Sequence, residues 1–563
     1  MSDTLWLDSR RLIGPNLIWD RPGALLEVAG EEPELSRQID LWSTFSLALM
    51  KALDWAGEET RSRVYPGGAL LAISAPVNAL FTATEVNEEA WTLACVAGGA
   101  AEFDSAAQRL GQALRTEAVA EALSIYQAAR KRSQTCLVDE LGVSIGSGCS
   151  GRYWPLDDLP SVESIDWQGV ADVPTALVTG TNGKTTSVRL LSAMIRAAGI
   201  SPGLSSTDWI QVGEQVLDHG DYSGPGGARQ VLRDARTEMA VLETARGGLL
   251  RRGLALEKAS VALVTNIAED HLGDGGINNL DELAEVKFMV TRVLGEEGTA
   301  VLNWDDAYCR AHAETLNAKI FWFSLHPPPE ACTGDAWFWF DGDQLQYRVG
   351  DKQGRLIAAE KAPITLAGSA RHNIANALGA AATANALGVP MRAIREALGS
   401  FGASIDDNPG RGNLVEINGV KVLLDFAHNP DGMQVIFEAG RALGTKRMAV
   451  IFGQAGDRSD DAIRDLTARI ADAGPDYFVI KEMGEYHRGR EAGEIPAIIR
   501  SELVRLGVDE DQIGYAETEI EASELAYRWA SPGDLLMLFI HSDRDAVLEH
   551  LEQVANGNKK DGA

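Results

Sequence analysis

Short, continuous hydrophobic segments alternate with amphipathic segments through most of the chain. Between about residues 170 and 405, apolar runs at 176–178, 239–242 and 261–264 are separated by stretches with helical periodicity. Continuous apolar runs are typical of parallel strands that are buried on both faces, and their alternation with helices predicts a parallel sheet with helices on both sides. The same alternation returns further along the chain, where strands are predicted at 422–424, 448–452, 477–480 and 535–540.

The first 165 or so residues have a different pattern, in which short strands and long helices are mixed. Strand-like runs occur at 23–28, 68–73 and 91–96, and helical stretches occur at 35–56 and 105–129. This pattern predicts an α+β amino-terminal domain.

Two polar passages predict the boundaries between domains. The Gly- and Ser-rich passage at 144–164 is typical of a linker, and 404–410 predicts a second boundary. A chain of 563 residues is too long for one hydrophobic core. We therefore predict an α/β protein of three domains, with a short disordered tail. Their predicted limits are 1–165 for the amino-terminal domain, 166–405 for the central parallel-sheet domain, 406–563 for a Rossmann-like carboxy-terminal domain, and 556–563 for the tail.

Aromatic residues gather at 321–323 and again at 337–340. Such a cluster can stack on a ligand or pack in the core. The residues alternate along predicted strands and are flanked by prolines at 327–329 and by Gly342, which favours a small antiparallel sheet packed on the core.

Charge and cysteine content exclude several classes of partner. The formal net charge of −30 disfavours binding to nucleic acid or to anionic lipid, so neither is expected as a partner. The five cysteines lie far apart and form no C-x-x-C pair, which predicts neither a disulfide framework nor a zinc site. The first 25 residues lack the apolar core of a signal peptide, and no apolar run approaches the length of a membrane span. A cytoplasmic location is therefore expected.

The segment at 178–186, Val-Thr-Gly-Thr-Asn-Gly-Lys-Thr-Thr, lies between a predicted strand and a predicted helix. Its glycines let backbone N–H groups approach a phosphate, and the helix directs its positive end toward the same charge. Lys184 would reach the terminal phosphates and Thr185 would offer a hydroxyl to Mg²⁺. The usual P-loop pattern has Gly where this chain has Val178, and the plainer interpretation is an ordinary helix-opening turn. The strand–loop–helix context favours a nucleoside triphosphate site, formed by Gly180, Thr181, Asn182, Gly183, Lys184, Thr185 and Thr186.

Acidic and basic residues follow the next predicted strands. Glu243 ends the strand at 239–242 and can hold Mg²⁺, while Arg246 follows in a glycine-bearing turn and could pair with a carboxylate or phosphate. His271 could ligate a second metal ion or simply cap the following helix. Lys287 lies on that helix, where spacing alone indicates only a solvated face.

Several of these motifs together resemble the Mur ligase family. Within that family, the chain is most similar to the ligase half of cyanophycin synthetases, over about 390 residues from 173 to 563. The opening segment 11–16 also resembles the amino-terminal domain of those synthetases. The segments that carry the resemblance are the loop at 180–186, 242–248, 269–272, Gly368 with 372–376, 408–411, 425–430, 456–458 and 488–490.

The resemblance implies a cofactor and metal chemistry for particular residues. Glu243 would hold a first Mg²⁺ with Thr185 and a second with His271, and a carbamylated Lys287 would be a further ligand of the second ion. Lys184 would neutralise charge on the γ-phosphate of ATP. The resemblance also assigns Asn376 to the adenine, Arg411 to the phosphates and Asp425 to the nucleotide, with closure of the carboxy-terminal domain hinged near 404–408.

In this family the carboxy-terminal domain binds the incoming amine donor, and acidic and basic pairs there would suit a zwitterionic amino acid. Glu482, for example, could select a basic side chain. Each residue taken singly is equally explained as a surface charge of a Rossmann-like domain. The predicted substrate residues are Arg246, His428, Asn429, Asp457, Arg458, Lys481, Glu482 and Arg488.

The resemblance implies an ATP-dependent ligase that joins an amino acid to the carboxylate of a small peptide or amino-acid acceptor through an acyl phosphate. An ATP-grasp domain, which cyanophycin synthetases carry, does not fit within residues 1–172, so this chain is not expected to make cyanophycin alone. A functional link to a cyanophycin-type synthetase is therefore left open. The role of the amino-terminal domain is also left open, between binding of the acceptor and a homo-oligomer contact. The rival hypothesis is a catalytically silent ATP-binding protein that regulates or scaffolds a partner synthetase. A mechanochemical P-loop ATPase or GTPase has no need of 372–376 or 409–411.

Overall fold

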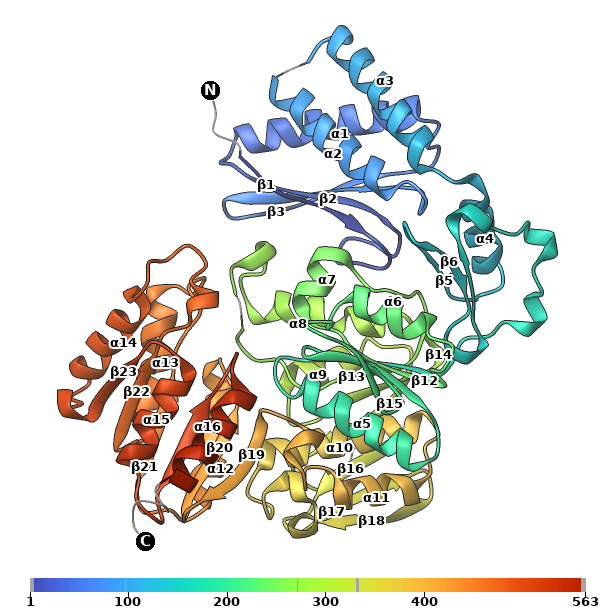
Figure 1. The fold of residues 1–563 in the computed structure, drawn as a ribbon. Helices are drawn as coiled ribbons and strands as arrows, with labels where there is room; N and C mark the ends of the chain where they lie inside the picture. Colours follow the sequence, from blue (N-terminus) through green and yellow to red (C-terminus); the bar gives the residue numbers. More distant parts are fainter. Residues whose placement is uncertain (1–4, 97, 271, 331–333, 558–563) are drawn as a thin grey trace.

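The computed structural model describes residues 5–96, 98–270, 272–330 and 334–557. Its strands form four sheets, of four, three, eleven and six strands in chain order. The amino-terminal block (residues 5–170) lies on one side of the central region (residues 175–400), and the C-terminal region (residues 411–557) lies beside the central region (Figure 1). The predicted α/β fold is confirmed, with an amino-terminal part built on antiparallel strands and two largely parallel sheets after it.

The amino-terminal block begins with an antiparallel sheet in the order β1-β2-β4-β3, and helices α1, α2 and α3 pack on it around the buried Trp42 and Trp91. The strand predicted at 91–96 is wrong, because these residues form the last turns of α2 and pack with the other helices of that core. The helical stretch at 105–129 is interrupted at Ala118, whose backbone is extended. The bounds are β1 (Leu5–Leu12), β2 (Gly23–Ala29), α1 (Glu34–Ala52), β3 (Thr60–Tyr65), β4 (Gly68–Ser74), α2 (Leu80–Val96), α3 (Ala100–Glu117) and α4 (Ala120–Arg130).

The Gly- and Ser-rich passage at 144–164 is not an extended linker. It contributes to an antiparallel sheet of β5 (Cys136–Val138), β6 (Gly142–Ile145) and β7 (Arg152–Pro155), followed by short 3₁₀ turns. Ser144 and Ser147 are buried, and the Ser147 hydroxyl accepts a hydrogen bond from the Val173 amide. The residues of this polar passage therefore form a compact, folded connection between the amino-terminal block and the central region.

The central region is built on one sheet in the order β11-β10-β9-β12-β8-β13-β14-β15-β16-β17-β18. From β9 to β16 the neighbouring strands are parallel, and antiparallel strands extend both edges. Helices α5, α10 and α11 cover one face, and α6, α7, α8 and α9 cover the other. As the pattern predicts, β8, β12 and β13 are almost completely buried, so their carboxyl ends meet at one edge of the sheet.

The elements of the central region follow in chain order. They are β8 (Thr175–Thr179), α5 (Lys184–Ala197), β9 (Pro202–Ser205), β10 (Trp209–Val212), β11 (Gln215–His219), α6 (Pro225–Arg233), β12 (Met239–Glu243), α7 (Arg246–Arg252), β13 (Ala259–Val264), α8 (Leu280–Phe288), β14 (Leu294–Asn303), α9 (Ala307–Ala313), β15 (Lys319–Ser324), β16 (Ala336–Phe340), β17 (Gln344–Val349), β18 (Lys352–Ala358), α10 (Arg371–Ala386) and α11 (Met391–Ser400).

The aromatic residues at 321–323 and 337–340 are core residues, as the pattern favours. They lie on β15 and β16 and are buried on both faces of the sheet. The small antiparallel sheet expected there is not separate, because β15 and β16 pair in parallel within the large sheet and only β17 and β18 continue it antiparallel.

The C-terminal region has a sheet in the order β19-β20-β24-β21-β22-β23, in which only the β19–β20 pair is antiparallel. Helices α12, α13 and α14 pack on one face, and α15 and α16 pack on the other. Most of the tail predicted to be disordered, 558–563, lies outside the described residues. The bounds are β19 (Arg411–Ile417), β20 (Val420–Asp425), α12 (Pro430–Ala442), β21 (Met448–Phe452), α13 (Asp460–Asp472), β22 (Tyr477–Lys481), α14 (Glu494–Arg505), β23 (Ile513–Ala516), α15 (Glu519–Trp529), β24 (Leu535–Phe539) and α16 (Arg544–Gly557).

Over the residues described, every helix is too short or too polar to cross a bilayer.

Candidate active site

The loop between β8 and α5 has the backbone that a phosphate-binding loop needs. Gly180 and Gly183 both have positive φ, at 141° and 84°. A Cβ atom on Gly180 would lie 1.9 Å from Oγ1 of Thr265, and one on Gly183 would lie 2.1 Å from Oδ1 of Asn376. Only glycine fits either position, so the loop can bring its backbone N–H groups close to a bound anion.

Lys184 begins helix α5 and folds back over this loop. Its Nζ donates to the carbonyl oxygens of Gly180 and Thr181, at 3.1 and 2.8 Å. The ammonium group is thereby held over the loop, beside the N-terminus of the helix, which no side chain caps, and the two sources of positive potential add there.

Oxygen ligands converge on Glu243 at the end of β12. This carboxylate is buried, and Thr185 Oγ1 lies 3.2 Å from its Oε1. Thr207 donates to the same carboxylate twice, through its hydroxyl at 2.8 Å and its backbone N–H at 3.2 Å. Two hydroxyls and one carboxylate are the hard oxygen donors that Mg²⁺ prefers, so the residues present fit a magnesium ion.

Lys287 is buried on α8 beneath the loop, where its Nζ donates to the carbonyl oxygen of Gly180 at 2.8 Å. It does not lie on a solvated face. Burial and the nearby charge of Lys184 hold its pKa well below the usual range for lysine, although Asp270 opposes the shift. His271, the other residue expected at a second metal ion, lies outside the described residues.

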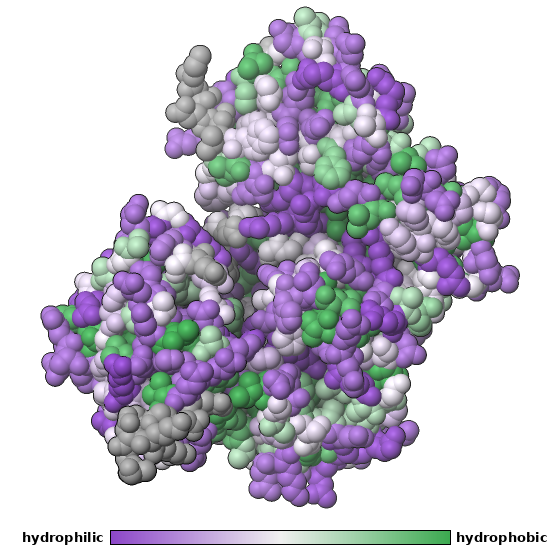
Figure 2. Space-filling model, viewed as in Figure 1, coloured by the Kyte–Doolittle hydropathy of each residue, from purple (hydrophilic) through white to green (hydrophobic). Residues whose placement is uncertain are grey.

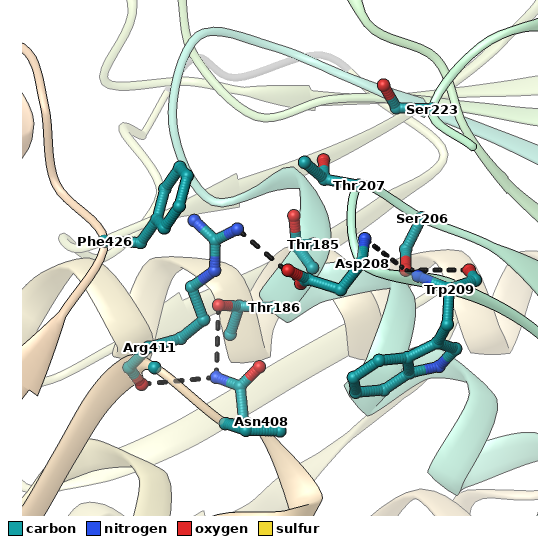
Figure 3. Close-up of polar contacts among 12 residues, drawn as sticks. Thr185, Thr186, Ser206, Thr207, Asp208, Trp209, Ser223, Asn408, Arg411 and Phe426 are labelled. Atoms are coloured by element: carbon teal, nitrogen blue, oxygen red, sulfur yellow. Dashed lines mark hydrogen bonds and ion pairs between the residues drawn. The ribbon is translucent and has the colours of Figure 1, made fainter. Parts of the chain in front are cut away.

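The C-terminal region contacts the central region through Arg411 and the segment before it. One guanidinium nitrogen of Arg411 lies 3.7 Å from the carboxylate of Asp208, and its guanidinium carbon lies 4.3 Å from the centre of the Phe426 ring (Figure 3). Asn408, which is buried, donates to the hydroxyl of Thr186 at 3.2 Å. Asp208 also forms a close ion pair with the buried Arg189.

A cavity of about 210 Å³ lies where these two regions meet. Asn376 lines it and is oriented by a 3.2 Å hydrogen bond to Oδ1 of Asn373. Asp425, on the opposite wall, has a pKa raised to about 6, mainly by burial and against the effect of Arg411. Among the predicted nucleotide residues, those that line this cavity are Thr181, Asn182, Gly183, Lys184, Thr185, Thr186, Glu243, Asn376, Arg411 and Asp425.

A larger cavity, of about 1090 Å³, adjoins the first and shares His428 with it. The residues that line it come from both regions, and Arg458 bridges them with a 3.1 Å ion pair to Asp270. Burial lowers the pKa of His428. Five predicted substrate residues meet here: His428, Asn429, Asp457, Arg458 and Arg488.

Three other predicted substrate residues do not line this larger cavity. Arg246 is buried at the start of α7, close enough to Lys287 to act on its charge. Lys481 is buried in a close ion pair with Glu519 and contacts His541 Nδ1 at 2.8 Å. Glu482 accepts hydrogen bonds from the Gly493 amide at 2.7 Å and from the His487 ring at 3.2 Å, so it holds the loop before α14.

Sequence reasoning missed Thr207, Asp208 and Asp270 as individual contributors. Thr207 and Asp208 follow β9 as part of Ser-Ser-Thr-Asp, a polar run directly after a buried strand. Their position directly after a strand is the sequence feature that could have identified them, because the carboxyl end of β9 lies at the same sheet edge as that of its parallel neighbour β12.

Comparisons with known proteins agree with this geometry. Residues 178–384 match the Mur ligase middle domain, and residues 410–539 match the Mur ligase, glutamate ligase domain. A cyanophycin synthetase of Crocosphaera subtropica is 36% identical over 383 residues, which are 67% of this chain and 43% of that protein. This chain thus spans less than half the length of that synthetase.

A UDP-N-acetylmuramoyl-L-alanyl-D-glutamate–2,6-diaminopimelate ligase of Syntrophomonas wolfei is 28% identical over 372 residues, covering 64% of this chain and 71% of that ligase. Among solved structures, E. coli FolC in complex with DHPP and ADP has a TM-score of 0.48 and 18% identity, covering 69% of this chain and 89% of FolC. The chain therefore carries the middle and C-terminal domains of the Mur ligase family and is homologous to cyanophycin synthetases and to Mur ligases.

Proposed function

We propose that this protein is an ATP-dependent ligase of the Mur type, which joins the carboxylate of a small peptide or amino-acid acceptor to the amino group of an amino acid. One observation carries the proposal. Lys184, Thr185 and Glu243 of the central region and Arg411 and Asp425 of the C-terminal region line a single cavity, which opens beside a larger cavity with mixed charges.

The first step brings two anions together, because a carboxylate oxygen attacks the γ-phosphorus of ATP to give an acyl phosphate and ADP. Lys184 and Arg411 are placed to reduce that repulsion and to stabilise charge in the transition state. Thr185, Thr207 and Glu243 would hold Mg²⁺, which supplies further neutralisation of the phosphates when bound. The amino group then attacks the acyl carbon, a proton leaves the nitrogen, and phosphate departs.

The larger cavity would hold the amine donor. Its acidic residues outnumber its basic ones, so it suits a substrate that carries a positive charge beside its carboxylate. Arg458 is already paired with Asp270. The exposed Arg488 forms a close ion pair with Asp457. The acidic residues are Glu269, Asp270, Asp457, Asp461 and Asp465, and the basic ones, apart from His428, are Arg251, Arg458 and Arg488.

Nucleotide entry requires the two regions to separate. The cavity of about 210 Å³ is smaller than the roughly 300 Å³ at the lower end of small-molecule sites. Separation would break polar contacts between the two regions, among them the Arg411–Asp208 pair and the 3.0 Å hydrogen bond from Asn429 to Asn182. We therefore propose a hinge at 404–408, where a 3₁₀ turn precedes Asn408.

The test is phosphate release from ATP and Mg²⁺ against a matrix of single amino acids and of dipeptides containing aspartate or arginine, with mass spectrometry on each reaction. A ligase releases phosphate only when acceptor and donor are both present, and its product is heavier than the acceptor by one residue. Phosphate release without any dependence on a second substrate would contradict ligation. Adding a cyanophycin-type synthetase to the same matrix tests the link to cyanophycin metabolism.

A further inference from the structure

A third cavity lies between the amino-terminal block and helices α6 and α7, with a volume of about 930 Å³. We call it the interdomain groove. Its walls are the end of β1, the start of α2, the β5–β6 hairpin, α6 and the last residue of α7. Within the described residues, it shares no lining residue with the nucleotide cavity or with the donor cavity. Figure 2 shows the mixed hydrophilic and hydrophobic surface where these parts of the molecule meet.

Several exposed hydrophobic side chains gather in this groove. Phe81, Leu141, Tyr153 and Leu217 all line it, and their exposed fractions range from 36% to 67%. Large hydrophobic side chains left exposed around one concave surface are typical of a binding site rather than of ordinary surface composition.

Four arginines also line the groove, although the chain carries a net charge of −30. Arg229 and Arg233 both pair with Asp139, at 3.2 and 2.7 Å. Arg229 is 8% exposed, and its Nε is buried without a hydrogen-bond partner in the described part of the chain.

The other two arginines are less well compensated. Arg11 lies over the Phe81 ring at 3.7 Å, and its partner is the exposed Glu140 at 3.5 Å. The backbone carbonyl of Arg252 accepts a hydrogen bond from the Ile13 amide at 2.9 Å, but its guanidinium forms neither a hydrogen bond nor an ion pair with any residue that the structure describes. Burial, followed by the charge of Arg11, lowers the pKa of Arg252. An anion between Arg11 and Arg252 would relieve their repulsion.

The remaining acids of the groove are engaged elsewhere. Glu117 accepts from the backbone amides of Phe81 and Thr82, at 2.8 and 2.6 Å, and from the Thr82 hydroxyl, so it caps the first turn of α2. Asp234 accepts from Nε of Arg236 at 2.9 Å. Neither acid contacts Arg252. Glu140 and Asp8 lie close enough to oppose the lowering of the Arg252 pKa, but neither forms an ion pair with its guanidinium in the described part of the chain.

We propose that the interdomain groove binds an organic anion, with an aromatic or aliphatic body against Phe81, Leu141 and Tyr153 and a carboxylate-type group held by Arg252 and Arg11. Such a ligand matches both the exposed hydrophobic wall and the arginines at its end. The site is separate from the proposed ligase reaction, and its test does not depend on turnover.

The probe is 1-anilinonaphthalene-8-sulfonate, an aromatic anion whose fluorescence rises in a hydrophobic site, titrated into the full chain in the presence of saturating ADP and Mg²⁺. Its neutral counterpart, N-phenyl-1-naphthylamine, lacks the sulfonate. We expect one saturable site for the anion and binding of the neutral probe at least about tenfold weaker, since a hydrogen bond to a charged group contributes about 1.5–3 kcal/mol.

The variants Arg252→Gln and Arg11→Gln each remove one cation, and Arg115→Gln removes an exposed arginine of α3 that does not line the groove. Circular dichroism and thermal melting show whether each variant folds. We expect both groove variants to weaken binding of the anion about tenfold and Arg115→Gln to leave it unchanged. If one groove variant fails to fold, the other still decides the question.

Two results would overturn the proposal. One is equal affinity for the anion in Arg252→Gln, Arg11→Gln and Arg115→Gln, and the other is equal affinity of the wild type for the charged and neutral probes.

Discussion

One guanidinium nitrogen of Arg411 lies 3.7 Å from the carboxylate of Asp208, and this pair joins the C-terminal region to the central sheet beside the nucleotide cavity. Asp208 is shared, because it also pairs closely with Arg189, a side chain with only 2% of its surface exposed. Arg189 in turn donates to Oδ1 of Asn408 at 3.2 Å. One carboxylate thus contacts both a buried structural arginine and the arginine that we place at the phosphates.

Replacing Asp208 should therefore lower stability. Asp208→Asn leaves Arg189 without its anion, and breaking a buried ion pair costs about 3 kcal/mol. The expected result is a fall of about 6 °C or more in the midpoint of thermal unfolding. Asp104→Asn, at an exposed position on α3, is the matched control. Equal melting of the two variants would show that Arg189 does not depend on Asp208.

Replacing Lys184 should remove turnover and keep the fold. Lys184→Met retains the aliphatic stem but loses the cation at the phosphate loop, so phosphate release should fall by about 10²–10³-fold. Lys361→Met, which removes an exposed lysine outside the cavity, should behave as the wild type. Wild-type turnover by Lys184→Met would refute the assignment of the loop.

Changing Glu243 should alter the dependence on magnesium. Glu243→Gln keeps the size of the side chain and removes its charge, so the Mg²⁺ concentration for half-maximal phosphate release should rise at least about tenfold. Glu238→Gln, just before the same strand, is the control because Glu238 is exposed at the opposite end. Coincident Mg²⁺ titrations for Glu243→Gln and Glu238→Gln would exclude Glu243 from the metal site.

Lys287 should react with carbon dioxide. Burial and Lys184 lower the pKa of Lys287, which raises the fraction of neutral amine. Its nitrogen would bond to the carbon of carbon dioxide and release a proton, leaving an anionic carbamate near Lys184 and Arg246. After incubation with ¹³C-bicarbonate, the wild type and Lys361→Met should show a carbamate resonance that Lys287→Met lacks. The same spectrum from all three proteins would contradict carbamylation.

Asp425 should make stability depend on pH. Burial raises its pKa from 3.8 to about 6, so ionisation opposes folding. The protonated carboxyl group contributes its full share to the free energy of unfolding below pH 3.8, and this contribution is lost as the pH rises through 6. Asp425→Asn removes this loss and should stabilise the protein at pH 7.5 by up to about 3 kcal/mol, at about 1.4 kcal/mol per pKa unit.

The measurement for Asp425 is thermal melting from pH 5 to pH 8. The gain in melting temperature of Asp425→Asn over the wild type should shrink as the pH falls toward 5. Asp351→Asn, in the exposed turn between β17 and β18, should show no such trend. A gain that is constant with pH would mean that Asp425 is not the titrating group.

Local sequence determined the elements that hold the phosphate loop. The apolar run of β8, the glycines at 180 and 183 and the helix that begins at Lys184 follow one another along the chain, so neighbouring residues specify them. Where local propensity and packing disagree, packing decides. Residues 91–96 include Trp91 and Val96, which favour strands, yet they complete α2 because their helix packs against α1 and α3.

Only the tertiary structure decided which side chains meet between distant segments. Thr207 reaches Glu243 because β9 and β12 are adjacent in the sheet, although 36 residues separate the two side chains in sequence. From its spacing alone, Lys287 resembles an ordinary solvent-exposed lysine of a helix. In the folded chain it is buried, and its Nζ donates to the carbonyl oxygen of Gly180. Periodicity and loop chemistry act over a few residues, so the sequence by itself determined the strands, helices and phosphate loop. The charges and hydrogen bonds across the regions depend on strand order and on how the regions pack, and these only the folded chain decides.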